Sequence, residues 1–265
     1  MSVPVFLAER EQLLSGGRVR LSGAEGKHAS AARRLTAGER VDLTDGAGLL
    51  AECVVTGTGR DELEVEVQAR GERPPPAPRL IAVQALPKGD RGELAVEAMT
   101  EAGVDVIVPW AASRCVTRWY PGRGEKALAR WRVKAREAAK QSRRVFLPEV
   151  TELATTVTVA ETLASTSCGV ILDGEADARL ADMPLPHVTQ GSGAADAAGD
   201  AWESRDIETG DIAVVIGPEG GVSPDERATF ESAGAVAARL GPTVLRTSTA
   251  GVAAAAVLFA RYGRW

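Results

Sequence analysis

Apolar and polar side chains alternate along the first part of the chain. Residues 40–46 alternate and end in an Asp-Gly pair, and 49–56 and 62–67 continue the same pattern. Alternation with a period of two is typical of half-buried strands, and Asp-Gly favours a tight turn between them. A short helix is expected before these strands, over 25–35. The chain is therefore predicted to begin with a small, barrel-like β module.

A proline-rich stretch follows the predicted strands. Residues 73–78 read Arg-Pro-Pro-Pro-Ala-Pro. Because proline fixes φ and lacks a backbone donor, such a run forms a stiff, extended linker rather than part of a helix or sheet. We therefore predict one domain over 1–72, a linker over 73–78 and a second domain over 79–265.

Short apolar runs alternate with helical periodicity in the second domain. The apolar runs predict strands over 80–86, 104–109, 170–172, 212–216 and 236–240. Strands that alternate with helices pair in parallel, since each helix carries the chain back to the start of the next strand. The predicted class is therefore α/β, with a mostly parallel sheet.

The helices between these strands have recognisable ends. Asp90 and Glu93 are predicted to cap a helix that Gly103 terminates. A long helix with one apolar stripe and many basic residues is expected over 125–144. An alanine-rich helix is expected to close the chain over 247–262.

Two glycine-containing turns stand out near the end of the chain, at 217–226 and 241–250. In the first, Ser223 is predicted as the N-cap, Pro224 as the first helical residue and Glu226 as the partner in a capping box. Ligands of parallel sheets bind at the carboxyl ends of the strands, where both turns lie. We interpret the turns as the wall of one ligand site, although two ordinary strand-to-helix turns would show the same spacing.

Composition narrows the class of protein. The 265 residues are 45% hydrophobic, which is enough for a substantial core. There is no apolar run of about 18 residues and no signal-peptide pattern, so we expect a cytoplasmic protein without a membrane span. Cys53, Cys115 and Cys168 are far apart and only two histidines are present, so we expect reduced thiols and no metal site. Residues 183–209 lack periodicity and are expected to form a mobile insertion.

The charge is unevenly distributed. The net charge is −5, but residues 110–146 carry eleven Lys or Arg against two Glu, a net +9, whereas 173–231 carry a net −11. A local basic patch, rather than the total charge, is what meets phosphate. The basic segment therefore predicts an RNA-binding surface, with a solvated helix face as the alternative.

The two turns, at this spacing, closely resemble the paired signature of the RsmE family. These are SPOUT-class RNA methyltransferases that modify N3 of one uridine, at position 1498, in the 16S RNA of the small ribosomal subunit. Further stretches resemble the family at 84–88, 100–104, 113–116 and 139–144, and its N-terminal PUA-like RNA-binding barrel at 28–34, 38–39 and 45–46. The resemblance covers nearly the whole chain.

The resemblance implies a C-terminal SPOUT α/β domain with a trefoil knot, a small N-terminal PUA-like β-barrel and a homodimer. It also implies that S-adenosylmethionine is held by three loops, at 172–174, 216–221 and 240–247. The cofactor-binding residues expected from it are Leu172, Ile216, Gly217, Glu219, Gly220, Gly221, Leu240, Gly241, Leu245, Arg246 and Thr247.

Two of these residues are candidates for catalysis. Arg246 is expected to hold the negative charge that develops on the uracil, or alternatively to pin its loop through a carboxylate such as Glu219. Many family members have Glu where this chain has Ser248, so a carboxylate base at that position is missing. Glu219 is the candidate replacement, with bonding to backbone amides as its other possible role.

The RNA contacts implied by the resemblance are spread over both domains: His28, Arg33, Arg34, Lys88, Arg114, Gln141, Arg143 and Arg144. Two other functions stay open, namely a SPOUT methyltransferase that acts on transfer RNA and an inactive ribosome-binding factor. A P-loop hydrolase is excluded, because no Lys-Ser/Thr follows the glycines of the first turn. A Rossmann-type methyltransferase is disfavoured, because no strand leads into a Gly-x-Gly-x-Gly turn.

Overall fold

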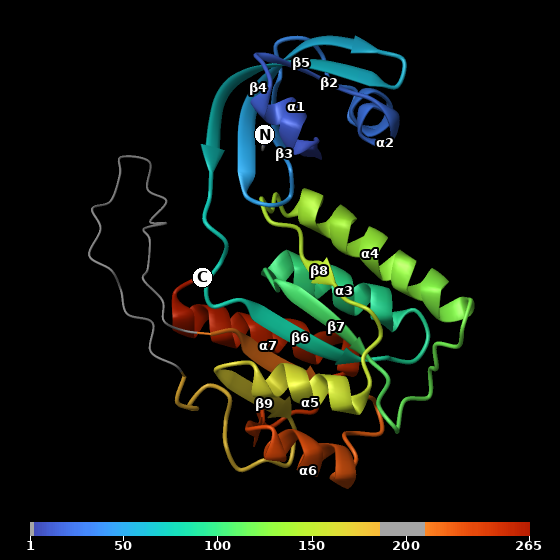
Figure 1. The fold of residues 1–265 in the computed structure, drawn as a ribbon, viewed down its shortest axis with the longest axis vertical. Helices are drawn as coiled ribbons and strands as arrows, with labels where there is room; N and C mark the ends of the chain where they lie inside the picture. The colour runs from blue at the N-terminus through green and yellow to red at the C-terminus, as the bar shows by residue number, and fades with distance from the viewer. Residues whose placement is uncertain (1–2, 186–209) are drawn as a thin grey trace. The chain divides into compact units, whose positions relative to one another are not determined.

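The computed structural model describes residues 3–185 and 210–265 (Figure 1). Beyond Leu185, the predicted insertion at 183–209 therefore lies outside the described residues. The chain forms two compact units, one of Met1–Pro75 with Arg136–Leu147 and one of Pro76–Ala135 with Pro148–Trp265. These units differ from the predicted domains in one respect. Residues 136–147 were expected in the second domain but cluster with the first unit.

The first unit is a five-stranded sheet. In spatial order its strands are β1 (Val5–Leu7), β3 (Arg40–Thr44), β4 (Leu49–Gly59), β5 (Glu62–Glu72) and β2 (Arg18–Leu21). Only the β1–β3 pair is parallel. The strands predicted from alternation are thus present as β3, β4 and β5, and their apolar positions, such as Leu43 and Leu63, are fully buried. Helix α1 (Arg10–Leu14) adds Leu13 to this core.

The helix predicted over 25–35 is wrong in detail. The structure has α2 (Gly23–Lys27) followed by a single π-helical turn, η1 (His28–Ala32). The Ser30 hydroxyl donates to the Gly26 carbonyl at 2.9 Å. A hydroxyl that competes for a helix carbonyl perturbs the regular ladder, which is consistent with the wider turn here.

Residues 136–147 join the first unit through specific bonds. Thr44 Oγ1 donates to the Val145 carbonyl at 3.2 Å, and the Leu147 amide donates to the Gly46 carbonyl at 2.8 Å. These bonds link segments about a hundred residues apart, which local sequence patterns do not indicate.

The second unit contains a six-stranded sheet in which every pair is parallel. In spatial order the strands are β11 (Ala235–Ala238), β9 (Cys168–Leu172), β10 (Ile212–Ile216), β6 (Leu80–Ala85), β7 (Val106–Trp110) and β8 (Glu149–Val150). The α/β class and the parallel sheet predicted from the sequence are therefore confirmed. The two-residue β8 was not predicted, because it is too short to show a pattern.

Helices α3 (Arg91–Ala102) and α7 (Thr247–Tyr262) pack against each other, and α7 lies on β6 and β10. Gly251 allows this close approach, because a Cβ there would lie 2.5 Å from Met99 Sδ and 3.6 Å from the Ile216 side chain. Gly103 ends α3 in the left-handed region, as predicted. The predicted cap at its start is wrong: Asp90 makes no side-chain capping bond, and Glu93 pairs with Arg130 at 2.8 Å.

The remaining helices are α4 (Arg123–Gln141), α5 (Thr156–Ala164) and α6 (Pro224–Ser232). Helix α5 was missed, because it begins Thr-Val-Thr-Val and β-branched residues favour strands. The Thr155 hydroxyl nevertheless caps it by accepting from the Thr158 amide at 3.2 Å. None of the helices in the described ranges has the length and apolar character needed to cross a bilayer.

Candidate functional site

The register of the parallel sheet brings the ends of four strands to one edge. Ile216, the last residue of β10, lies opposite Leu172 of β9 and Gln84 of β6, and Ala238 of β11 also lies opposite Leu172. The amide of Asp173 then donates to the Ala238 carbonyl at 3.0 Å. The loops that follow these strands therefore start side by side, at the carboxyl edge where parallel sheets bind ligands.

The loop after β10 is a tight glycine turn. Gly221 has a φ of +72°, which favours glycine, and its amide donates to the Pro218 carbonyl at 2.9 Å. A Cβ on Gly217 would lie 3.0 Å from Val222 Cγ2, and one on Gly220 would lie 3.2 Å from Arg114 Cβ. Side chains at these positions would crowd the turn, so the glycines keep its backbone compact and accessible.

Two other loops hold this turn in place. Arg114 Nη1 donates to the Gly220 carbonyl at 3.1 Å, and Glu219 Oε1 accepts from the Lys88 amide at 3.1 Å. The loops that carry Arg114 and Lys88 are themselves joined, since Thr117 Oγ1 donates to the Pro87 carbonyl at 2.8 Å. The glycine turn is thus fixed by contacts to the loops after β6 and β7.

Glu226 connects the start of α6 to the loop after β7. Its Oε2 accepts from the Ser223 amide and hydroxyl at 3.0 and 2.8 Å, which completes the predicted capping box. Its Oε1 accepts from the Ser113 amide at 2.6 Å. Burial of the carboxyl is the largest single influence and opposes ionisation, but the bonds from Ser113 and Ser223 together outweigh it and lower the pKa of Glu226.

The segment after β11 has a different character. Within the described part of the chain, residues 241–245 make no backbone hydrogen bond. Val244 is 94% exposed and Leu245 is 40% exposed. The Arg246 side chain is exposed, and Thr247 begins the buried face of α7. This segment therefore offers unpaired backbone N–H and C=O groups next to exposed apolar side chains, and both kinds of group can bind a ligand.

The predicted cofactor residues fall into two groups in the structure. Those on the first two loops lie at the ends of neighbouring strands and in the glycine turn: Leu172, Ile216, Gly217, Glu219, Gly220 and Gly221. Those on the third loop follow β11 at the same edge: Leu240, Gly241, Leu245, Arg246 and Thr247. The register thus starts all three loops along one edge of the sheet.

The two catalytic candidates are not paired with each other. Among the described side chains no ion pair joins Arg246 to Glu219, and Glu219 bonds the Lys88 amide instead. This contact corresponds to the alternative in which Glu219 bonds the backbone. Ser248 is 3% exposed in the first turn of α7.

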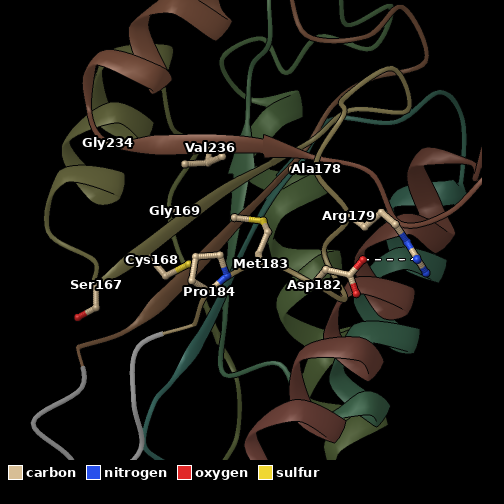
Figure 2. A pocket seen from close by; sticks show the side chains of 10 residues that line it. All are labelled: Ser167, Cys168, Gly169, Ala178, Arg179, Asp182, Met183, Pro184, Gly234 and Val236. Atoms are coloured by element: carbon tan, nitrogen blue, oxygen red, sulfur yellow. Dashed lines mark ion pairs between the residues drawn. The ribbon is translucent and has the colours of Figure 1, made fainter.

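A pocket of about 410 Å³ opens near the amino ends of β9 and β11. Cys168, Gly169 and Val236 line it together with Arg179 and Asp182, whose side chains form an ion pair at 3.4 Å (Figure 2). The described residues that line it include none of those predicted to bind the cofactor. The pocket and the loops at the carboxyl edge are therefore separate features of the second unit.

Several predicted RNA contacts lie together in the first unit. Arg33 Nη2 donates to Gln141 Oε1 at 3.2 Å. Arg34 and Arg143 both hold left-handed backbone conformations, with φ values of +52° and +56°. Such conformations cost a non-glycine residue about 1–2 kcal/mol and are found at functional positions.

His28 has a different environment from these arginines. Its ring packs edge-on against Phe6 with the centroids 5.8 Å apart. Burial, followed by the charge of Lys140, lowers the pKa of His28. The ring is half-buried, and its packing against Phe6 corresponds to a structural role for His28 in the first unit.

Sequence reasoning missed the contacts that Glu226 and Asp173 make across the site. Glu226 was predicted only as part of a local cap, although it also bonds the Ser113 amide. Asp173 Oδ2 accepts from Arg227 Nη1 at 2.5 Å and so ties the loop after β9 to α6. The capping box was the only local signal, because both contacts join residues far apart in the chain.

Replacing Glu226 with Gln tests this connection. We expect the free energy of unfolding to fall by about 1–3 kcal/mol at pH 7, because buried donors lose a charged acceptor. The difference in the free energy of unfolding between the variant and wild type should shrink as the pH falls below 4.5, the ordinary pKa of a glutamate carboxyl. The pKa of Glu226 is lowered, so the stabilisation belongs to its ionised form and is lost when the carboxyl is protonated. Chemical denaturation across pH measures both effects.

The matched control is Asp225→Asn, which removes an exposed carboxylate one residue away. It should change the free energy of unfolding by less than about 0.5 kcal/mol. Equal effects of the two substitutions would contradict the role given to Glu226.

Comparison with known proteins gives a consistent picture. An RNA methyltransferase domain matches residues 74–259, and an RNA methyltransferase PUA domain matches residues 21–68. The chain is 42% identical over 249 residues to Ribosomal RNA small subunit methyltransferase E of Mycobacterium bovis, covering 92% of this chain and 87% of that protein. It is 24% identical to the protein of the same name from Bacillus subtilis, over 91% and 89% of the two chains.

Two solved structures have the same fold as this chain. Ribosomal RNA small subunit methyltransferase E of Neisseria gonorrhoeae, bound to S-adenosylmethionine, matches with a TM-score of 0.79 and 25% identity. A putative methyltransferase of Legionella pneumophila, in complex with the same cofactor, matches with a TM-score of 0.80 and 24% identity. Each match covers 98% of both chains. On the domain matches and the 42% identity, this chain belongs to the RsmE family of SPOUT-class RNA methyltransferases.

Proposed function

We propose that this protein transfers the methyl group of S-adenosylmethionine to N3 of a uridine, position 1498, in the 16S RNA of the small ribosomal subunit. The observation that carries the proposal is the parallel register, which starts the two signature turns along one edge of the sheet. Membership of the family supplies the reaction type and the RNA class.

The loops at this edge suit S-adenosylmethionine. The unpaired backbone of 241–245 offers donors and acceptors to the adenosine and methionine parts, and the glycine turn admits close approach. Ile216, Leu172 and Leu240 supply apolar surface for the adenine. When bound, the cofactor supplies an electrophilic methyl group on a good leaving group, so the protein mainly has to position the two reactants.

The uracil must lose its N3 proton during the reaction. In our proposal Arg246 holds the negative charge that this leaves on the base, aided by the positive end of the α7 dipole at Thr247 and Ser248. The proton passes to solvent, since Ser248 provides no carboxylate. Glu219 keeps the glycine turn in place through the Lys88 amide.

The proposed RNA contacts lie on each of the two units, taken separately. The first unit contributes Arg33, Arg34, Gln141, Arg143 and Arg144 together with the half-buried His28, and the second contributes Lys88 and Arg114. Cationic side chains of this kind bind phosphates and set the register of an RNA chain, whereas base edges give specificity. The division of the chain into a first domain that ends at residue 72 and a second domain that begins at residue 79 is part of the same proposal.

A knotted C-terminus and a homodimer complete the proposal. After the edge strand β11, the Arg239 amide and carbonyl bond Ala178 and Leu180, so a preceding loop lies beside the returning chain. Helix α7 then packs on β6 and β10, several strands away. This return path supports the trefoil knot typical of SPOUT domains. We place the dimer in the cytoplasm, with the small ribosomal subunit as its partner.

The function is tested by mass spectrometry of ribosomal RNA from cells with and without this protein. We expect 3-methyluridine at the proposed position only when the protein is present. Methylation of transfer RNA instead would show that the substrate class is wrong. Failure of S-adenosylmethionine to bind in a calorimetric titration would favour an inactive ribosome-binding factor.

Replacing Arg246 with Lys tests the catalytic role. Lysine keeps the charge but loses the planar fork, so we expect kcat to fall by about 10–100-fold in single-turnover methylation. The control is Arg179→Lys, which keeps an exposed ion pair with Asp182. Near wild-type turnover of the Arg246→Lys enzyme would remove Arg246 from the mechanism.

Replacing Arg143 with Gly separates RNA binding from stability. Glycine relieves the left-handed strain, so we expect the free energy of unfolding to stay equal or rise by up to about 1 kcal/mol. The affinity for ribosomal RNA should nevertheless fall. The slope of the logarithm of affinity against the logarithm of salt concentration should decrease by about one, because one phosphate contact is lost. Asp61→Gly, at a φ of +60°, is the control that relieves similar strain and should leave RNA affinity unchanged.

A further inference from the structure

A long segment connects β7 to α4 (Figure 1). It carries cations and an exposed aromatic ring. Residues 114–126, which we call the arm, contain four Lys or Arg and one Glu. Tyr120 is 62% exposed and Val116 is 71% exposed. Apart from Arg114, no residue of the arm belongs to the set of RNA contacts that the family resemblance implies.

The arm is anchored at several points along its length. Arg114 donates to the Gly220 carbonyl of the glycine turn, and Thr117 donates to the Pro87 carbonyl. Trp119 packs edge-on against Trp131 of α4 with the centroids 5.1 Å apart. The Tyr120 carbonyl then accepts from the amides of Arg123 and Gly124. These contacts fix the backbone on both sides of Tyr120 while its ring remains exposed.

The cations of the arm, two of which lie in the first turn of α4, differ from Arg130 and Arg132 further along that helix. Arg130 pairs with Glu93, and Arg132 pairs with Glu152, both at 2.8 Å. Within the described ranges, the exposed Arg118, Arg123 and Lys126 form no such ion pair. Their charges are therefore available to a polyanion, whereas those of Arg130 and Arg132 are already paired with carboxylates.

The arm is also close enough to the glycine turn to act with it. Thr117 bonds Pro87, whose neighbour Lys88 bonds Glu219 of the turn. Tyr120 is three positions after Thr117 in the chain, which limits the distance between their Cα atoms to about 11 Å. Tyr120 therefore lies near the loop after β6 that holds the glycine turn.

We propose that the arm binds the single-stranded RNA next to the target uridine, with a flanking base stacked on Tyr120 and the phosphates held by Arg118 and Arg123. Exposed aromatic rings among cations are the usual platform for unpaired bases. Because the anchors order the arm in advance, little conformational entropy is lost on binding. This inference rests on the proposed function and specifies how its substrate is positioned.

The test compares Tyr120→Ala with Tyr120→Phe, using small ribosomal subunits that lack the methyl group. Loss of stacking in Tyr120→Ala should raise KM for the subunits at least about fivefold. Tyr120→Phe should stay within about twofold of wild type, because phenylalanine retains the stacking face. The Kd of S-adenosylmethionine and the Tm should be unchanged in both variants, since the side chain of Tyr120 is largely exposed.

The double variant Arg118→Ala/Arg123→Ala should raise KM further and make it less dependent on salt. Arg60→Ala, which removes one exposed arginine in the first unit, is the control for the loss of a surface cation away from the arm and should leave KM unchanged. A KM for Tyr120→Ala within twofold of wild type, or equal defects in the Ala and Phe variants, would overturn the inference.

The same experiment keeps the two proposals distinguishable. Wild-type methylation with no effect of Tyr120→Ala would reject the arm while leaving the proposed reaction intact. If wild type does not methylate the subunits, the proposed reaction fails. Binding of the same subunits, measured by filter retention, then still decides whether Tyr120 contacts RNA, with weaker retention of Tyr120→Ala expected and equal retention rejecting the arm.

Discussion

The parallel pairing of β10 with β9 on one side and β6 on the other is the constraint on which the site depends. It fixes Ile216 opposite both Leu172 and Gln84, so that three loops leave the sheet at one edge. A register shift of one residue would turn every side chain of β10 to the opposite face of the sheet. The fully buried strand resists such a shift, because it would lose its packing on both faces.

Long-range polar contacts then convert this edge into a fixed arrangement of loops. The carboxylate of Glu226 and the guanidinium of Arg114 both bridge from the loop after β7 to the region that follows β10. Each uses a charged group to bond backbone atoms, which gives stronger and more directional bonds than neutral pairs. The loops can therefore present their backbone to a ligand without collapsing onto each other.

The arginines of the basic segment serve separate purposes despite their closeness in sequence. Arg130 and Arg132 neutralise acids on the surface, whereas Arg114 supports the glycine turn. Others, such as Arg118, keep their charge exposed to solvent. Net charge along the chain identified the segment, but only the positions of the acids reveal which cations remain available.

The sequence by itself determined the elements whose signals are local. Alternation located β3, β4 and β5, and the capping box placed the start of α6 at Pro224. The signature turns identified the family before any contact was visible. Tertiary structure alone decided the π-helical turn at η1, the β-branched start of α5 and the partners of Glu219 and Glu226. The partners of Glu219 and Glu226 lie more than a hundred positions away, and at η1 and α5 local hydroxyl bonds override the intrinsic preference of the residues, whereas periodicity describes only the pattern along the chain.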